Sequence, residues 1–163
     1  MISAAAEQSP LIMGFLLGGI MKMICTSPLS SMALTAMLGL DGLAMGIAAI
    51  ACVGGSFTNG IIFDRLKLGE RSNVIAVMLE PLTQADIITQ NPIPIYGSNF
   101  FGGGLAGLAA AMLGIINNAP GTASPIPGLL APFGFNPPLK VVAAIVLAAI
   151  GGSLAGFVGS IVF

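Results

Sequence analysis

The polar side chains best suited to chemistry in this sequence lie together just after residue 79. Glu80 stands directly before Pro81, and the polar residues that follow it are Thr83, Gln84, Asp86, Gln90 and Asn91. Acids and amides suit a sugar ligand, because each sugar hydroxyl can both donate and accept a hydrogen bond. A carboxylate can also orient a hydroxyl, or accept its proton, as that hydroxyl attacks phosphorus. We predict a substrate-binding group of Glu80, Gln84, Asp86 and Asn91. The alternative is a water-exposed amphipathic loop over residues 80–90.

Two further amides and two charged residues lie within or beside apolar stretches. Asn117 and Asn118 follow an apolar run, and we include both among the candidate substrate-binding residues, although helix-end amides commonly act as caps. Lys22 lies inside an apolar stretch, where ionisable residues are costly and often functional. It could instead extend its charged end to the membrane surface. Asp41 precedes Gly42 and favours a capping or interface role.

The composition excludes several other kinds of site. The chain has no His and only two cysteines, so we expect no zinc or haem site, no other metal site and no cofactor. We interpret Cys25 and Cys52 as packing thiols, since free cysteines are usually buried. Five basic and six acidic residues provide no basic surface for nucleic acid.

These residues must be positioned by a membrane domain. Of the 163 residues, 56% are hydrophobic and only 7% are charged, against about 25% charged in soluble domains. We predict an all-α integral membrane protein with a single membrane domain over residues 1–163. A spanning helix needs about 20 apolar residues, and three stretches qualify: 42–63, 98–117 and 139–163. A fourth, 11–26, is slightly short, and 29–40 and 73–88 are too short or too interrupted to assign.

Two apolar segments, 91–97 (NPIPIYG) and 118–138, are rich in proline and contain no charged residue. Non-helical backbone at membrane depth is tolerated where protein buries it or where it lines a cavity, and such broken segments mark substrate sites in many transporters. We predict that one or both are re-entrant. The alternative is a pair of apolar loops at the membrane surface.

Glycines recur at three- and four-residue spacing in the predicted spans, which predicts densely packed helices with closely approaching backbones. Three of the five basic residues lie between residues 64 and 71. The positive-inside rule therefore places that loop in the cytoplasm, and the span 42–63 runs from outside to inside.

Several stretches together resemble the integral-membrane subunit, enzyme IIC, of a bacterial sugar phosphotransferase system, in the divergent branch that includes toxin-regulator-like proteins. They are SPLSS at 27–31, the Gly-rich run 39–60, NPIP at 91–94, NAPGTASPIPG at 118–128 and FGF at 133–135. The chain is similar to the C-terminal half of such proteins. From this resemblance we expect either a half-size product, which assembles with itself or with a second membrane half, or a fragment of a longer chain.

The resemblance implies a multi-pass protein of the bacterial inner (cytoplasmic) membrane that binds and translocates a sugar. A separate cytoplasmic protein would donate the phosphoryl group, because the chain has no soluble domain with a phosphorylatable Cys or His and so no phosphorylated residue of its own. Glu80 would accept the sugar hydroxyl, and Asn91, Asn117 and Asn118 would orient it. The loop 65–71 would face the donor.

Two other functions remain open at this point. Gly-rich helix faces and re-entrant segments also suit a channel or ion-coupled carrier built from several copies of the chain. A membrane regulator that binds a cytoplasmic partner through residues 64–71, without transport, is the third hypothesis.

Overall fold

The structure, a computed structural model, describes residues 7–26, 37–79, 84–118 and 130–162. All of the regular elements in these ranges are helices. In chain order they are α2 (Pro10–Thr26), α4 (Gly42–Leu66), α5 (Arg71–Leu79), α6 (Ala85–Gln90), α7 (Pro92–Leu113), the short 3-10 helix η2 (Ala131–Gly134) and α9 (Pro138–Val162).

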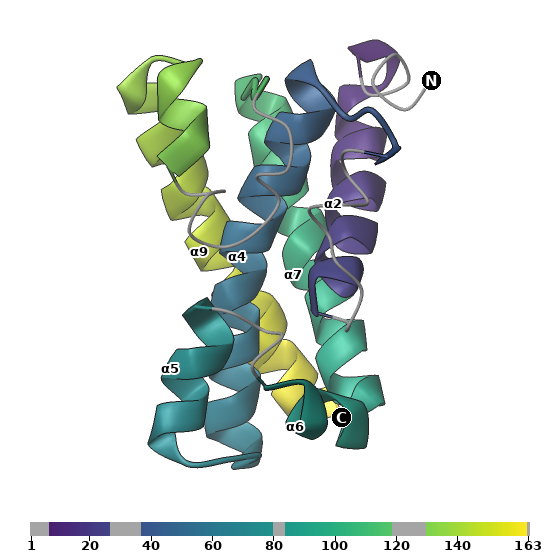
Figure 1. Ribbon diagram of the computed structural model, residues 1–163, viewed down its shortest axis with the longest axis vertical. Helices are drawn as coiled ribbons and strands as arrows, with labels where there is room; N and C mark the ends of the chain where they lie inside the picture. The colour runs from purple at the N-terminus through teal and green to yellow at the C-terminus, as the bar shows by residue number, and fades with distance from the viewer. Residues whose placement is uncertain (1–6, 27–36, 80–83, 119–129, 163) are drawn as a thin grey trace.

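Four long helices, α2, α4, α7 and α9, lie side by side in a bundle (Figure 1). The helix α7 runs opposite to the other three. Of the helices described, α4 and α9 are long and apolar enough to cross a membrane, and α4 is almost wholly buried whereas most of α9 is exposed. A helix that is apolar all round is either the core helix of a large protein or a membrane span. An exposed apolar face such as that of α9 suits contact with lipid.

The helices approach each other so closely that backbone meets backbone. A methyl group added at Gly152 of α9 would overlap the carbonyl oxygen of Gly54 in α4. Further close approaches join α2 to α7, at Gly14 with Gly107 and at Gly18 with Gly103. In an apolar solvent, where the hydrophobic effect cannot drive helices together, such contacts provide van der Waals attraction between them. Glycines thus stand at points where these helices come close together.

A second group of contacts holds the short helices to the end of the bundle near the loop 67–70. The helices α5 and α6 pack there through buried side chains, together with the end of α4 and the start of α7; these side chains are Ile62, Phe63, Val77, Ile88 and Ile95. The loop itself begins at Lys67, which ends α4 in the left-handed conformation (φ 52°).

The predicted spans 42–63 and 139–163 correspond to α4 and to α9, apart from residue 163, which lies outside the described ranges. The span predicted for 98–117 was displaced. The helix α7 begins at Pro92 and ends at Leu113, because Gly114 takes the left-handed conformation (φ 65°) that commonly terminates helices.

The prediction of a broken segment at 91–97 was wrong, since residues 92–97 form the first turns of α7. Proline is tolerated there because the first N–H groups of a helix have no partner within it, so losing one costs little. Of the second segment, residues 119–129 lie outside the described part of the chain. The remainder contains η2 and the start of α9, and its re-entrant character stays a prediction.

We predict that Gly152→Ala destabilises the bundle by about 1 to 3 kcal/mol, because its new methyl group must push α9 away from the Gly54 carbonyl. Alanine is otherwise the better helix former by about 1 kcal/mol. A lower free energy of unfolding would therefore indicate the overlap, whereas a higher one would indicate helix propensity alone. Thermal unfolding in detergent provides the measurement. Gly134→Ala is the matched control, since nothing lies within reach of a methyl group there. A rise in the Tm of Gly152→Ala would contradict the close approach.

Candidate functional site

Three of the predicted site residues lie around α6. Gln84 accepts a hydrogen bond from the Asn73 side chain (Nδ2 to Oε1, 2.6 Å). Asn91 donates from its side chain to the Ile87 carbonyl oxygen (3.0 Å) and so closes the end of α6. Asp86 is exposed. These polar groups therefore form a partly solvent-exposed surface where α5, α6 and α7 meet. Glu80 lies outside the described residues.

The other two predicted residues lie beside Gly42, at the opposite end of α4 from α5 and α6. The Asn117 backbone N–H donates to the carbonyl oxygen of Gly42 (3.0 Å), and the side-chain oxygen of Asn118 accepts the Gly42 N–H (3.1 Å). Asn118 thus caps the start of α4, a helix distant from it in sequence. A helix of the 25 residues in α4 is about 37 Å long. The structure does not bring the five predicted residues that it describes into one site.

The interior of the bundle contains a different set of polar side chains, between α2, α4, α7 and α9. The set comprises Lys22, Ser56, Thr58, Asn59, Ser98 and Asn99, all of them buried. We call these six residues the buried polar row. Burying a polar group away from water costs free energy unless it is paired, and polar residues inside membrane domains are typically functional. The buried polar row is therefore our candidate functional site.

Lys22 forms one end of the buried polar row. Its side chain is 0% exposed, and its ammonium group donates to the Cys52 carbonyl oxygen (3.4 Å), which also accepts from the Ser56 hydroxyl (2.9 Å). The aliphatic stem fits against Gly55 of α4 and Gly103 of α7, where any larger residue would overlap it. The suggestion that Lys22 extends to the membrane surface was therefore wrong, because the glycines of both neighbouring helices leave room for the side chain inside.

Asn59 and Asn99 form the other end, two turns along α4 from Cys52. The Asn99 amide donates to the Asn59 side-chain oxygen (2.5 Å) and to the Ile95 carbonyl oxygen (2.7 Å). The Asn59 amide nitrogen, the Asn99 side-chain oxygen and the Ser98 hydroxyl are buried and have no hydrogen-bond partner within the described structure. The row thus presents an ammonium group, a free amide donor and a free amide acceptor within about 10 Å along α4. A neutral ligand with several hydroxyls could engage donors and acceptors of this kind.

Sequence reasoning missed Asn59 and Asn99. The available signal was an amide inside or beside an apolar run, in SFTNG and in GSNFF. That signal was lost because the span ending in Asn117 was expected to begin at Ser98, which would place Asn99 at a helix end. In the structure α7 begins six residues earlier, so Ser98 and Asn99 lie well inside the bundle.

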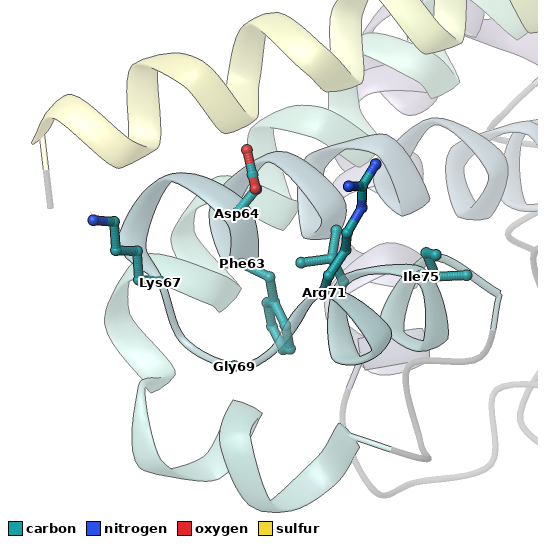
Figure 2. A pocket seen from close by; sticks show the side chains of 7 residues that line it. Phe63, Asp64, Lys67, Gly69, Arg71 and Ile75 are labelled. Carbon is teal, nitrogen blue, oxygen red and sulfur yellow. The ribbon is translucent and has the colours of Figure 1, made fainter.

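A pocket of about 520 Å³ lies where α4 turns into α5. Phe63, Asp64, Lys67 and Arg71 are among the residues that line it. Figure 2 shows Phe63 pointing from α4 toward α5, whereas the three charged side chains extend outward. These three charged side chains are exposed, whereas Phe63 is fully buried. The pocket thus presents two cations and one carboxylate to the outside, at the end of α4 nearest to Asn59.

We predict that the paired amides stabilise each other. In a double-mutant cycle, Asn59→Ala and Asn99→Ala should show a coupling of about 1 kcal/mol, the size typical of hydrogen bonds between membrane helices. Unfolding in detergent followed by circular dichroism provides the free energies. Asn59→Ala combined with Asn136→Ala is the control and should be additive within about 0.5 kcal/mol, because Asn136 bonds Ile116 at the far end of the bundle. Additivity of the first pair would contradict the contact.

Comparison with known proteins assigns the whole chain to one protein family. No curated protein sequence and no solved structure matches the chain. A model of one protein family, described as "Phosphotransferase system, EIIC", matches residues 1–163 and so covers every element described above. Members of this family are membrane-embedded components of phosphotransferase permeases and work with a cytoplasmic phosphoryl donor. The chain belongs to the phosphotransferase system EIIC family.

Proposed function

We propose that the chain binds a sugar against the buried polar row and releases it toward the pocket between α4 and α5, where a separate cytoplasmic protein phosphorylates it. The observation that carries this proposal is the buried amide pair Asn59–Asn99 with its unpaired donor and acceptor, in a chain of a sugar-transporting family. Lys22 would donate a third hydrogen bond to the ligand.

The geometry gives the sugar a short way out of the bundle. Gly60, the neighbour of Asn59, packs against Met78 of α5, and the pocket at the end of α4 lies about one to two turns beyond Asn59. Movement of α5 relative to α4 would join the row to the pocket. The exposed Lys67 and Arg71 would then face the negatively charged phosphoryl group of the donor.

Glu80 directly follows Leu79, the last residue of α5, and we keep it as the proposed acceptor of the hydroxyl proton. In the transfer, the sugar oxygen attacks phosphorus, the bond from phosphorus to the donor protein breaks, and the sugar proton passes to a carboxylate. The product carries about −1.5 to −2 charges. It therefore remains in the cytoplasm, because a charged group crosses an apolar bilayer only at high cost.

This placement gives the outlying residues roles other than the direct sugar contacts first predicted for them. Gln84, Asp86 and Asn91 would form the wet face of the cytoplasmic end. Asn117 and Asn118, which hold the opposite end of α4, would line the entry from outside. A second copy or a second membrane half would complete the cavity, and the mass of the detergent-solubilised particle, measured by light scattering, distinguishes these arrangements.

We predict that Glu80→Gln weakens sugar binding at least about tenfold, because a carboxylate forms stronger hydrogen bonds to hydroxyls than a neutral amide does. Equilibrium binding of a panel of radiolabelled sugars to the purified protein provides the measurement. Glu7→Gln, at an exposed position near the start of α2, makes the same chemical change and should leave affinity unchanged. Equal affinity of the Glu80→Gln and unaltered proteins would refute the role of Glu80.

We predict a different pattern for Lys22→Met, which retains most of the stem against Gly55 and Gly103 but removes the charge. Replacing a buried charge with an apolar side chain of similar shape is often neutral or stabilising. The Tm should therefore hold or rise, while sugar affinity falls about tenfold. Lys140→Met, at an exposed position on α9, is the matched control. Unchanged affinity with Lys22→Met would mean that the row binds no sugar through this residue.

The same preparation discriminates the other two functions. Uptake of unmodified solute into liposomes, without any cytoplasmic protein, would indicate a channel or carrier. Binding of a cytoplasmic protein at the loop 64–71, with no solute bound by any preparation, would indicate a regulator. Either result would overturn the proposal.

A further inference from the structure

A groove runs along the outside of the bundle between α4 and α9, which lie side by side in Figure 1. It has a volume of about 470 Å³ and is lined by Ile61, Ala149, Ile150, Ser153, Leu154 and Phe157. The apolar side chains at its rim are half exposed. From Ile150 to Phe157 it extends about 10 Å along α9. The groove therefore opens sideways, in the direction from which lipid would approach.

A cation lies over Phe157, the groove residue nearest to the end of α9. Arg65 lies one helical turn beyond Ile61 on α4, and its guanidinium carbon is 4.3 Å from the centre of the Phe157 ring. Its Nε–H donates to the Ser160 hydroxyl (2.6 Å), which in turn donates to the Phe157 carbonyl oxygen (2.6 Å). Two contacts with α9 therefore fix the plane of the guanidinium group.

This arrangement leaves the outer edge of the guanidinium group available. An arginine has five N–H donors, and the structure uses the one on Nε. Arg65 is exposed, and it forms no ion pair with any carboxylate of the described residues. Its sequence neighbour Asp64 lines the other pocket, between α4 and α5. A stacked guanidinium with a free edge is suited to bind a phosphate group through two parallel hydrogen bonds.

We propose that this groove is a binding site for an anionic phospholipid of the cytoplasmic leaflet. The phosphate of the headgroup binds the free edge of Arg65, and one acyl chain lies along the groove against Ile61, Ile150 and Leu154. The charge selects an anionic headgroup, since basic residues at the cytoplasmic surface attract such lipids. The apolar groove selects a lipid over free phosphate. The bound lipid bridges α4 and α9, the helices that also meet at Gly54 and Gly152.

The test compares phosphatidylglycerol with phosphatidylcholine of the same acyl chains. Each is titrated into the detergent-purified protein, with bound lipid counted by native mass spectrometry and the Tm followed in parallel. We expect phosphatidylglycerol to bind about tenfold more tightly, the scale of one charge-assisted contact, and to raise the Tm, because a ligand that binds only the folded state stabilises it. Arg65→Gln should abolish this preference. Lys67→Gln removes an equal charge two residues away and should change it less than twofold.

Two further variants keep the test decisive if Arg65→Gln does not fold. Arg65→Lys retains the charge but loses the planar paired contact, and Ser153→Phe fills the groove while leaving Arg65 intact. Each should reduce the preference at least threefold. A full preference in both variants would overturn the proposal, as would an equal loss with Lys67→Gln. If glycerol phosphate bound as tightly as the intact lipid, the groove would contribute nothing to lipid binding, and the proposal would also be overturned. No sugar is involved, so the outcome is independent of the proposed transport function.

Discussion

Contact between helix backbones at paired glycines is the constraint on which the rest of this structure depends. Where Gly54 meets Gly152, and where α2 meets α7 at Gly18 and Gly103, a single methyl group would overlap a backbone atom of the neighbouring helix. Because lipid chains are as apolar as leucine, burying leucine between helices provides little driving force in a membrane. Close backbone contact provides the attraction instead, and it fixes how α2, α4, α7 and α9 are aligned.

The same glycines make room for the buried polar row. The Lys22 stem needs the space left by Gly55 and Gly103, and the Thr58 hydroxyl reaches the Gly152 carbonyl oxygen (2.7 Å) because α9 lies so close to α4. A bundle packed through larger side chains would hold these groups apart and leave more of them without partners, at a cost of several kcal/mol each in hydrocarbon. The packing that stabilises the fold therefore also sets the spacing of the groups proposed to bind a sugar.

Predictions from the sequence succeeded where apolar residues filled a long stretch. They failed where a short pattern was compatible with two different local structures. The segments that form α4 and α9 are apolar for about 20 residues. A run of this length predicts a long apolar helix whatever the individual residues within it are. Pro92 and Pro94 were interpreted as breaking a helix, yet proline is also favoured in a first turn, and the helix α7 begins there. Asn118 was considered as a cap for its own helix, whereas it caps α4.

The sequence by itself was enough to predict a helical membrane protein and its family. These properties depend on composition and on the order of motifs along the chain. Only the tertiary structure decided which polar residues meet. Asn59 and Asn99 are 40 residues apart and form a hydrogen bond. Asn91 and Asn117 are closer in sequence, yet they lie beyond opposite ends of α7. The physical reason is that antiparallel helices bring distant positions to the same depth, and the register between them is set by contacts that no single helix contains.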